Sequence, residues 1–406
     1  MTEPHLARPD YDVIVVGGGP AGSSAAYFLS ESGKRVLVLE KEIFPRYKTC
    51  GGGLSVRFLH QQFPFSFDPI IKTNVTAVSY VYRHQETTIS LSPNAISVVM
   101  RDELDAYLLQ QLKAEIIYGK EVQRVRELED GVQVETKDGT CYTAAYLIGA
   151  DGANSNVARS IWLRKRRILA AAIEAEVQVP PEMMRTFGDR LMFIFGEIHY
   201  GYLWIFPKQN HLTIGIGALH PKPGELQNTL NKVMARYGIN LSETPLHGHP
   251  IPIYARHELV STRKIMLVGD AAGLADPLSG EGIRFAIKSG RLAAESILRG
   301  HPEQYPKNLR RTIGLNHRLT MIISIAFYFF QDPFLLFGTP NPFSTQGIVE
   351  MLADRMTATE FILVGFITLP LFIVTEVIAR LLNQLGFSSL SRRLRTRIYP
   401  ADVSAS

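Results

Sequence analysis

Three glycines near the start of the sequence have the spacing of a phosphate-binding turn. Gly17, Gly19 and Gly22 form G-x-G-x-x-G within YDVIVVGGGPAGSSAAYFLSE. Glycines in this pattern allow a tight turn and bring backbone N–H groups and a helix N-terminus close to a pyrophosphate. The apolar residues up to Val16 predict a buried parallel strand, and residues 23–29 predict the following helix. This order of strand, turn and helix turns a weak motif into a prediction of dinucleotide binding.

Two further strand ends carry carboxylates suited to a dinucleotide. The predicted strand RVLVLE ends with Glu40, where a carboxylate can accept hydrogen bonds from a ribose hydroxyl. In KIMLVGDAAGLADPLSGEGIRF, Asp270 follows a short strand, and Gly280 and Gly282 lead into the next helix. A helix-capping Asp with loop glycines would explain that segment alone. Their combination with the first motif favours a flavin dinucleotide.

Length and composition limit the possible classes. A chain of 406 residues suits two or three domains. Two cysteines, Cys50 and Cys141, favour a reducing, cytoplasmic compartment, and the polar opening residues predict no secretory signal. The net charge is +5, but the sequence has no stretch in which basic and aromatic residues alternate, as nucleic-acid-binding segments often do. No nucleic-acid partner is therefore predicted. No spacing of metal ligands is found, and no metal site is expected.

The motifs together resemble the geranylgeranyl reductase family. Between about residues 11 and 300 the chain carries G-x-G-P-A-G, a strand-end glutamate, C-G-G, D-G, and G-D-A-A-G-x-x-x-P-L-x-G-E-G-I. That family belongs to a larger flavoprotein group with the aromatic hydroxylases and the flavin-dependent halogenases. The resemblance implies a tightly held FAD, reduced by NADPH or NADH that binds transiently, and the saturation of isoprenoid double bonds.

The resemblance also implies which residues contact FAD. The first glycine motif would contact the pyrophosphate, Glu40 the adenosine ribose, Val122 the adenine through its backbone, and Arg101 the phosphates or ribityl chain. Asp270, Gly282 and their neighbours would hold the ribityl chain and the isoalloxazine. The expected cofactor-binding residues are Gly17, Gly19, Ala21, Gly22, Glu40, Lys41, Cys50, Gly51, Gly52, Arg101, Val122, Asp270, Gly280, Gly282 and Ile283.

A cysteine followed by three glycines, in RYKTCGGGLS, is the candidate catalytic segment. In the family the C-G-G stretch approaches the flavin, and glycines let the chain pass a flat ring that a β-carbon would obstruct. Cys50 could then act as a proton donor, because reducing an alkene requires a proton at the second carbon. The alternative is a small buried thiol that packs beside the cofactor.

The stretch GYLWIFPK predicts a strand with Tyr202, Trp204 and Phe206 on one face. The resemblance implies that these aromatic residues form a substrate wall over the flavin. The family carries a proline three positions before the tyrosine, where this chain has His199, so only the Y-x-W-x-F-P part matches. Ordinary core packing is the alternative for an aromatic stripe. Halogenases depend on a lysine that spacing does not locate in this chain.

These placements predict an α/β fold with a Rossmann-like FAD-binding domain, an inserted antiparallel-sheet substrate domain and a helical, apolar C-terminal segment. The expected FAD-binding domain is discontinuous, with residues 8–72, 100–160 and 261–300. Residues 73–99 and 161–260 would form the antiparallel β substrate domain, and residues 301–406 the helical segment. No second dinucleotide motif between a strand and a helix is found, which agrees with transient nicotinamide binding.

The C-terminal segment is apolar enough to raise the question of a membrane. LTMIISIAFYFF is too short to span a bilayer. Residues 361–382 are long enough but contain Pro370, Glu376 and Arg380, which are unfavourable in hydrocarbon. We expect amphipathic or monotopic helices, with the arginines of residues 392–397 near lipid phosphates. A spanning helix, an ordinary helical subdomain and a solvated basic tail are the alternatives. The expected location is cytoplasmic, peripheral on the cytoplasmic membrane face.

The leading functional prediction is an FAD-dependent oxidoreductase that reduces geranylgeranyl-type double bonds in a hydrophobic prenyl or polyene substrate. Its electrons would come from a nicotinamide cofactor or from ferredoxin. The first alternative is a flavin-dependent monooxygenase or halogenase, which shares the fold but uses oxygen. The second is a flavoprotein without catalysis. The presence of C-G-G together with P-L-x-G-E-G-I favours the reductase.

Overall fold

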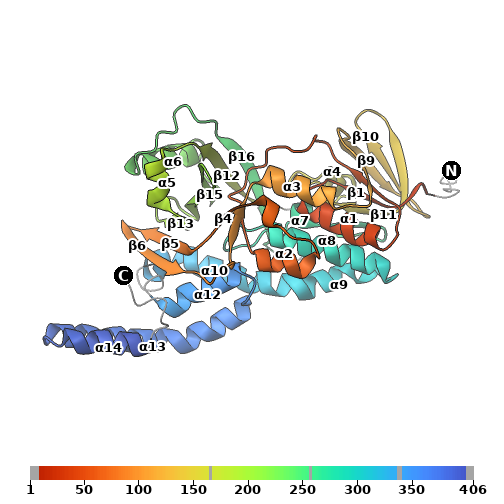
Figure 1. Cartoon of the computed structure of the whole chain (residues 1–406). Helices are drawn as coiled ribbons and strands as arrows, with labels where there is room; N and C mark the ends of the chain where they lie inside the picture. Colours follow the sequence, from red (N-terminus) through yellow and green to blue (C-terminus); the bar gives the residue numbers. More distant parts are fainter. Residues whose placement is uncertain (1–8, 164–166, 256–257, 336–340, 399–406) are drawn as a thin grey trace. The chain divides into compact units, whose positions relative to one another are not determined.

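The computed structural model describes residues 9–163, 167–255, 258–335 and 341–398 (Figure 1). Internal contacts divide the chain into two units, each built from three segments. Unit 1 comprises residues 1–48, 100–170 and 250–321, and unit 2 comprises residues 49–99, 171–249 and 322–406. The fold class predicted from the sequence is confirmed. The functional domain boundaries stay a prediction.

Unit 1 is built on a Rossmann-like sheet. Its strand order is β8-β2-β1-β11-β10-β9, with β17 also paired to β11. Pairs β1–β2, β1–β11, β2–β8 and β11–β17 are parallel, whereas β9, β10 and β11 are antiparallel neighbours. The strands are β1 (Tyr11–Val16), β2 (Val36–Leu39), β8 (Glu115–Ile117), β9 (Val122–Glu127), β10 (Val132–Thr136), β11 (Cys141–Gly149) and β17 (Ile265–Leu267). The central strands are apolar runs that are buried on both faces, as parallel sheets require.

Two long helices of unit 1, α1 (Pro20–Glu31) and α8 (Ile283–Leu298), lie side by side (Figure 1). They approach so closely that a Cβ on Gly290 would stand 2.2 Å from the carbonyl oxygen of Ala21. Ser24 Oγ donates a hydrogen bond to the carbonyl of Ile287 at 2.9 Å. The other helices that begin in unit 1 are α3 (Arg101–Gln110), α4 (Asn156–Ser160), α7 (Gly269–Ala272), α9 (Tyr305–Leu309) and α10 (Leu315–Phe329), with short helical turns at Pro302–Gln304 and Arg310–Gly314.

Unit 2 contains a second seven-stranded sheet, of order β16-β12-β15-β14-β13-β5-β6. Its strands are β5 (Ala77–Tyr82), β6 (Gln85–Ser90), β12 (Ile168–Val177), β13 (Arg190–Phe195), β14 (Gly201–Pro207), β15 (Leu212–Leu219) and β16 (His247–Ile253). The predicted antiparallel pairing is found for β5–β6, β13–β14 and β14–β15, but β5 and β13 are parallel. The long chain excursion through unit 1 between these two strands supplies the crossover that a parallel pair needs.

The rest of unit 2 is a small sheet and several helices. The small sheet has the order β3-β7-β4, with β3 (Gly53–Leu54), β4 (Ile71–Asn74) and β7 (Ser97–Val99). The helices of its first two segments are α2 (Val56–Gln62), α5 (Pro181–Phe187) and α6 (Glu225–Arg236), with a short turn at Asp68–Ile70. The C-terminal segment is helical, as predicted, with the second half of α10, then α11 (Gln331–Pro333), α12 (Pro342–Leu352), α13 (Ala358–Gln384) and α14 (Ser388–Ile398).

Candidate functional site

The glycine motif of unit 1 forms a turn that other residues could not form. Gly17 has φ +100°, and a Cβ there would stand 2.5 Å from the carbonyl oxygen of Ala150. A Cβ on Gly22 would stand 1.9 Å from the carbonyl oxygen of Gly17. Gly19, by contrast, has open space where its Cβ would be, and it precedes α1 without a side-chain cap. The N-terminus of α1 therefore fits a pyrophosphate, which the N–H groups of its first turn would bind.

Glu40 lies directly after β2 and is tied to this turn. The side chain is buried, and its Oε2 accepts a hydrogen bond from the Gly18 N–H at 2.6 Å. Its Oε1 accepts from the Glu42 N–H at 2.9 Å. Each carboxylate oxygen keeps a further lone pair, so Glu40 fits the role of a ribose acceptor. Lys41, the next predicted residue, has an exposed side chain whose Nζ lies 3.6 Å from Glu42 Oε1.

The second flavin segment lies next to the first. A Cβ on Gly269 would stand 2.9 Å from the Cβ of Ala21, at the start of α1. Asp270 Oδ1 lies 3.4 Å from the position that a Cβ on Gly282 would take. Gly282 directly precedes Ile283, the first residue of α8. Unit 1 thus brings together the glycine motif, Asp270 and the start of α8, as FAD binding requires.

The remaining predicted residues of unit 1 make hydrogen bonds to neighbouring residues. Arg101 makes two hydrogen bonds to Asp105, at 3.0 and 2.9 Å, and Asp105 also accepts from Arg46 at 2.9 Å. The carbonyl of Val122 accepts a hydrogen bond from Asn156 Nδ2 at 2.8 Å. Gly280 has φ +70° and donates its N–H to the Asp276 carbonyl at 2.9 Å. The role of these residues toward a nucleotide stays a prediction.

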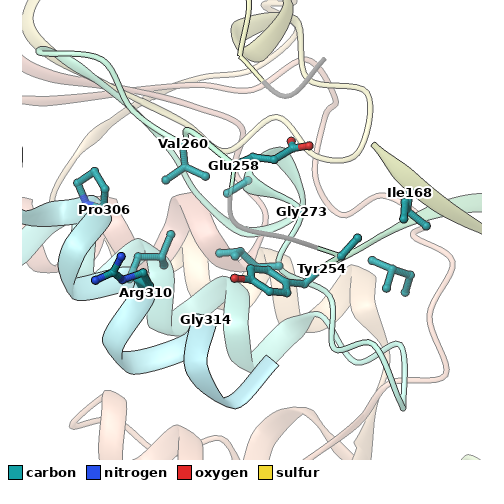
Figure 2. Close-up of a pocket in the computed structure, with 13 residues that line it drawn as sticks. Ile168, Tyr254, Glu258, Val260, Gly273, Pro306, Arg310 and Gly314 are labelled. Atoms are coloured by element: carbon teal, nitrogen blue, oxygen red, sulfur yellow. The ribbon is translucent and has the colours of Figure 1, made fainter. Parts of the chain in front are cut away.

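A small pocket lies beside the loop that follows α7 (Figure 2). Gly273, Tyr254, Glu258, Arg310 and Gly314 are among its lining residues. Its volume of about 30 Å³ suits one or two water molecules and is too small for a nucleotide. Its lining includes none of Gly17, Gly22, Glu40 and Asp270, the residues that the motifs indicate for FAD.

In unit 2 the C-G-G segment is held by two buried charged side chains. Glu174, on β12, accepts a hydrogen bond from the Cys50 N–H at 2.5 Å. Lys208 directly follows β14, and its Nζ donates to the carbonyl oxygens of Gly51 at 2.7 Å and Val99 at 2.9 Å. The two side chains are 0% and 2% exposed, respectively. They fix the backbone of the segment from β12 and from the residue that follows β14.

The same segment packs against the aromatic residues of β14. A Cβ on Gly51 would stand 2.7 Å from the Phe206 ring and 3.3 Å from Trp204 Nε1. Gly52 has φ +76°, and a Cβ there would stand 2.0 Å from the Val99 carbonyl oxygen. These two positions therefore require glycine. The Cys50 sulfur accepts a hydrogen bond from the Gly52 N–H at 3.4 Å, which turns the thiol back over its own loop.

Trp204 fills space that glycines on the neighbouring strand leave open. A Cβ on Gly215, which pairs with Trp204 across β14 and β15, would stand 2.1 Å from the indole. Tyr202, two residues earlier, has its ring centroid 6.0 Å from that of Trp204. The predicted side-chain alternation on β14 is therefore correct, and unit 2 brings Cys50, Gly51, Trp204 and Phe206 together. A contact of these residues with substrate stays a prediction.

Sequence reasoning missed Glu174 and Lys208 as parts of this site. A signal for Lys208 was present, because it directly follows Y-x-W-x-F-P. Glu174 and Glu176 lie within the otherwise apolar strand sequence ILAAAIEAEV, and the sequence alone does not show which of them is buried or what it contacts. Among the residues that the structure describes, no group of three His, Cys, Asp or Glu side chains is placed to hold a metal.

Comparison with known proteins agrees with this geometry. Residues 10–298 match the FAD binding domain family. Geranylgeranyl diphosphate reductase of Arabidopsis thaliana is 31% identical over 323 residues, which cover 73% of this chain and 68% of that protein. Menaquinone reductase of Mycolicibacterium smegmatis is 31% identical over 354 residues, which cover 77% of this chain and 85% of that protein.

The fold agrees as well. A solved structure of a geranylgeranyl bacteriochlorophyll reductase-like protein from Thermoplasma acidophilum superposes with a TM-score of 0.72 at 23% identity, covering 92% of this chain and 99% of that one. The resemblance stated from the sequence motifs is confirmed. The chain belongs to the geranylgeranyl reductase-like FAD-dependent oxidoreductases.

Proposed function

We propose that this protein reduces carbon–carbon double bonds of an isoprenoid substrate, with electrons from NADPH, NADH or ferredoxin. The observation that carries the proposal is the arrangement in unit 2, where the C-G-G loop is clamped against Trp204 and Phe206. An aromatic surface of this kind suits an apolar chain with π-bonds. The names of the relatives, geranylgeranyl diphosphate reductase and menaquinone reductase, support the same class of substrate.

The residues of unit 1 would hold FAD, which, once reduced by the electron donor, would supply a hydride to one carbon of the double bond. The N-terminus of α1 would bind the pyrophosphate, and Glu40 the adenosine ribose. Asp270 and Gly282 would hold the ribityl chain and the ring. Because Glu40 already accepts from the Gly18 N–H, ribose binding and the shape of the phosphate turn are linked.

Cys50 is the proposed proton donor to the second carbon. A thiol that gives up its proton becomes negatively charged, and the Gly52 N–H aimed at its sulfur stabilises that charge. The hydrogen bond from the Cys50 N–H to Glu174 fixes the position of the residue. The aromatic face of β14 keeps water away from the alkene while the proton is delivered.

The proposal is tested by anaerobic reoxidation of the dithionite-reduced holoprotein on addition of geranylgeranyl substrates. We expect flavin absorbance to return at a rate that depends on substrate, and the Cys50→Ser and Cys50→Ala variants to slow this at least about tenfold. Cys141→Ser is the matched control, because Cys141 is exposed. If no substrate reoxidises the flavin anaerobically but one stimulates oxygen uptake in air, the protein is a monooxygenase or halogenase instead.

We further propose that the protein is cytoplasmic and docks on the membrane face through α13 and α14. By length and composition alone, α13 could also cross a bilayer. Exposed apolar residues run along most of the length of α13. They are Leu363, Phe366, Ile367, Leu369, Leu371, Ile373, Val374, Val377, Ile378 and Leu381.

In-plane docking explains the charges of this hairpin better than spanning does. Arg395 of α14 pairs with Glu376 of α13 at 2.7 and 2.9 Å, and the two helices lie side by side (Figure 1). A surface location leaves this pair hydrated, whereas a spanning helix would place Glu376 in hydrocarbon. Arg392 and Arg393 are exposed and suit anionic lipid headgroups.

Vesicle co-sedimentation tests the docking proposal. Vesicles of phosphatidylcholine with phosphatidylglycerol should sediment the protein, and the double variant Phe366→Ser with Ile367→Ser should stay in the supernatant. Ile43→Ser is the control, because Ile43 is an equally exposed apolar residue of unit 1. Arg392→Gln should weaken binding about fivefold, and only to vesicles that contain the anionic lipid. Equal sedimentation of the double variant and the parent would refute docking through α13.

A further inference from the structure

Tyr80, on β5, has a buried hydroxyl that makes no hydrogen bond to the described residues. The residue is 6% exposed, and no hydrogen-bond partner for its Oη is found among the residues that the structure describes. Its ring stacks on Phe193 and Phe195, with centroids 6.0 and 6.3 Å away. Burial alone raises the pKa of Tyr80, so the hydroxyl stays protonated and remains a donor. A buried donor without a partner is rare and requires an explanation.

A second unpartnered donor lies in the same row of the sheet. Tyr80 and Trp204 each pair with Phe193, from opposite sides, so all three side chains lie on one face. Trp204 Nε1 is buried and also has no partner among the described residues. An indole N–H can only donate. Tyr82, two residues after Tyr80, shows the usual outcome, because its hydroxyl donates to Asp332.

We propose that Tyr80 determines substrate specificity by donating a hydrogen bond to an uncharged oxygen of the isoprenoid substrate. The Trp204 N–H is a second donor, nearer to Gly51. The inference rests on the proposed function and narrows its substrate class. Two donors without acceptors call for oxygen atoms in the ligand, which a pure hydrocarbon polyene lacks.

The required oxygen is uncharged because the cations described near this row already have partners. The ammonium of Lys208 donates to two backbone carbonyls. The guanidinium of Arg83, which lies over the Tyr82 ring, is paired with Asp332. Burying a diphosphate among aromatic rings without a cation is strongly unfavourable. A quinone carbonyl or an ester carbonyl fits, and a diphosphate does not belong at this position.

Trp204 itself provides the measurement of binding. The chain has two tryptophans, and Trp162 is 75% exposed in unit 1. In the FAD-loaded Trp162→Phe protein, the emission of Trp204 alone reports ligand binding. The ligands are menaquinone-4 (quinone carbonyls), geranylgeranyl acetate (an ester) and geranylgeranyl diphosphate, which share one four-unit prenyl chain. The variants are Tyr80→Phe and, as the control on the same strand, Tyr82→Phe.

We expect Tyr80→Phe to raise the Kd of menaquinone-4 or geranylgeranyl acetate roughly three- to tenfold, and that of geranylgeranyl diphosphate by less than twofold. A loss for only one of the first two identifies its oxygen as the acceptor, and Tyr82→Phe should leave all three Kd values unchanged. The fold should survive Tyr80→Phe, because no partner is left unpaired. Unchanged affinity for both neutral ligands, or an equal loss for all three, overturns the inference. Failure of the reductase proposal is separate, because it appears as absent turnover while these binding differences remain.

Discussion

The ammonium of Lys208 lies 2.7 Å from the carbonyl oxygen of Gly51 and 2.9 Å from that of Val99. Lysine is almost never fully buried unless its charge is satisfied. Here it joins the C-G-G loop to the end of β7, while Glu174 holds the same loop by the Cys50 N–H. The position of Cys50 relative to Trp204 and Phe206 therefore depends on one side chain of β12 and one that directly follows β14.

Replacing Lys208 with Met should lower both the free energy of unfolding and the rate of turnover. The variant leaves the carbonyls of Gly51 and Val99 without their donor, which should lower the free energy of unfolding by about 2–4 kcal/mol. Turnover should fall at least about tenfold even at temperatures where the variant is folded. Urea unfolding and anaerobic turnover measure the two effects. Lys222→Met, at an exposed position, is the control. A folded Lys208→Met protein with full turnover would show that the hydrogen bonds from Lys208 to Gly51 and Val99 are not needed for catalysis.

Two glycines of the C-G-G-G run, Gly51 and Gly53, should respond differently to alanine. At Gly51 the added methyl would stand 2.7 Å from the Phe206 ring, so Gly51→Ala should cost about 1–3 kcal/mol and displace the aromatic wall. At Gly53 the nearest atom, also on Phe206, is 3.3 Å away, so Gly53→Ala should cost less. Thermal unfolding and turnover of the two variants provide the comparison. Equal loss in both variants would contradict the packing described here.

Glu40→Gln should weaken retention of FAD. One carboxylate oxygen becomes an NH₂ group that faces a backbone N–H, from either Gly18 or Glu42, so the phosphate turn loses an acceptor. Loss of a hydrogen bond to a charged group corresponds to roughly 10- to 100-fold weaker binding. The ratio of flavin to protein absorbance after gel filtration measures it. Glu42→Gln, whose side chain is 50% exposed, should keep its FAD. Full FAD content in Glu40→Gln would refute the role given to Glu40.

His317 should make stability depend on pH. Its Nε2 bonds with the Leu274 carbonyl at 3.0 Å, and burial lowers its pKa below the ordinary 6.5. Asp276, whose Oδ2 lies 3.9 Å from Nδ1, opposes this shift, whereas Arg284 and Lys288 add to it. Below pH 6.5 the unfolded chain binds a proton that the folded protein does not, so stability falls as pH falls.

The slope from His317 should reach at most about 1.4 kcal/mol per pH unit. Urea unfolding between pH 7.5 and 5.5 measures it, and His317→Gln, which keeps a side-chain donor for Leu274, should show a shallower dependence. If the parent and His317→Gln lose stability in parallel over this range, His317 does not titrate as described.

The sequence predicted what depends on local pattern. The strand up to Val16, the turn at Gly17 and the strand end at Glu40 follow from hydrophobic runs and glycine spacing, and Trp204 and Phe206 from alternation. The parallel pairing of β5 with β13 was not predicted, because it depends on where the β13–β14 hairpin, far from β5 in the sequence, joins the sheet. Glu174 and Tyr80 were missed for the same reason. Their importance comes from partners, or the lack of partners, on strands far away in the sequence.

The most direct test of the account is the mass of the product formed anaerobically. The reduced holoprotein, incubated without oxygen with a geranylgeranyl substrate, should yield a product heavier by two hydrogens for each double bond reduced, read by mass spectrometry. Recovery of unchanged substrate without oxygen, together with a product that gains oxygen or halogen in air, would contradict the reductase account.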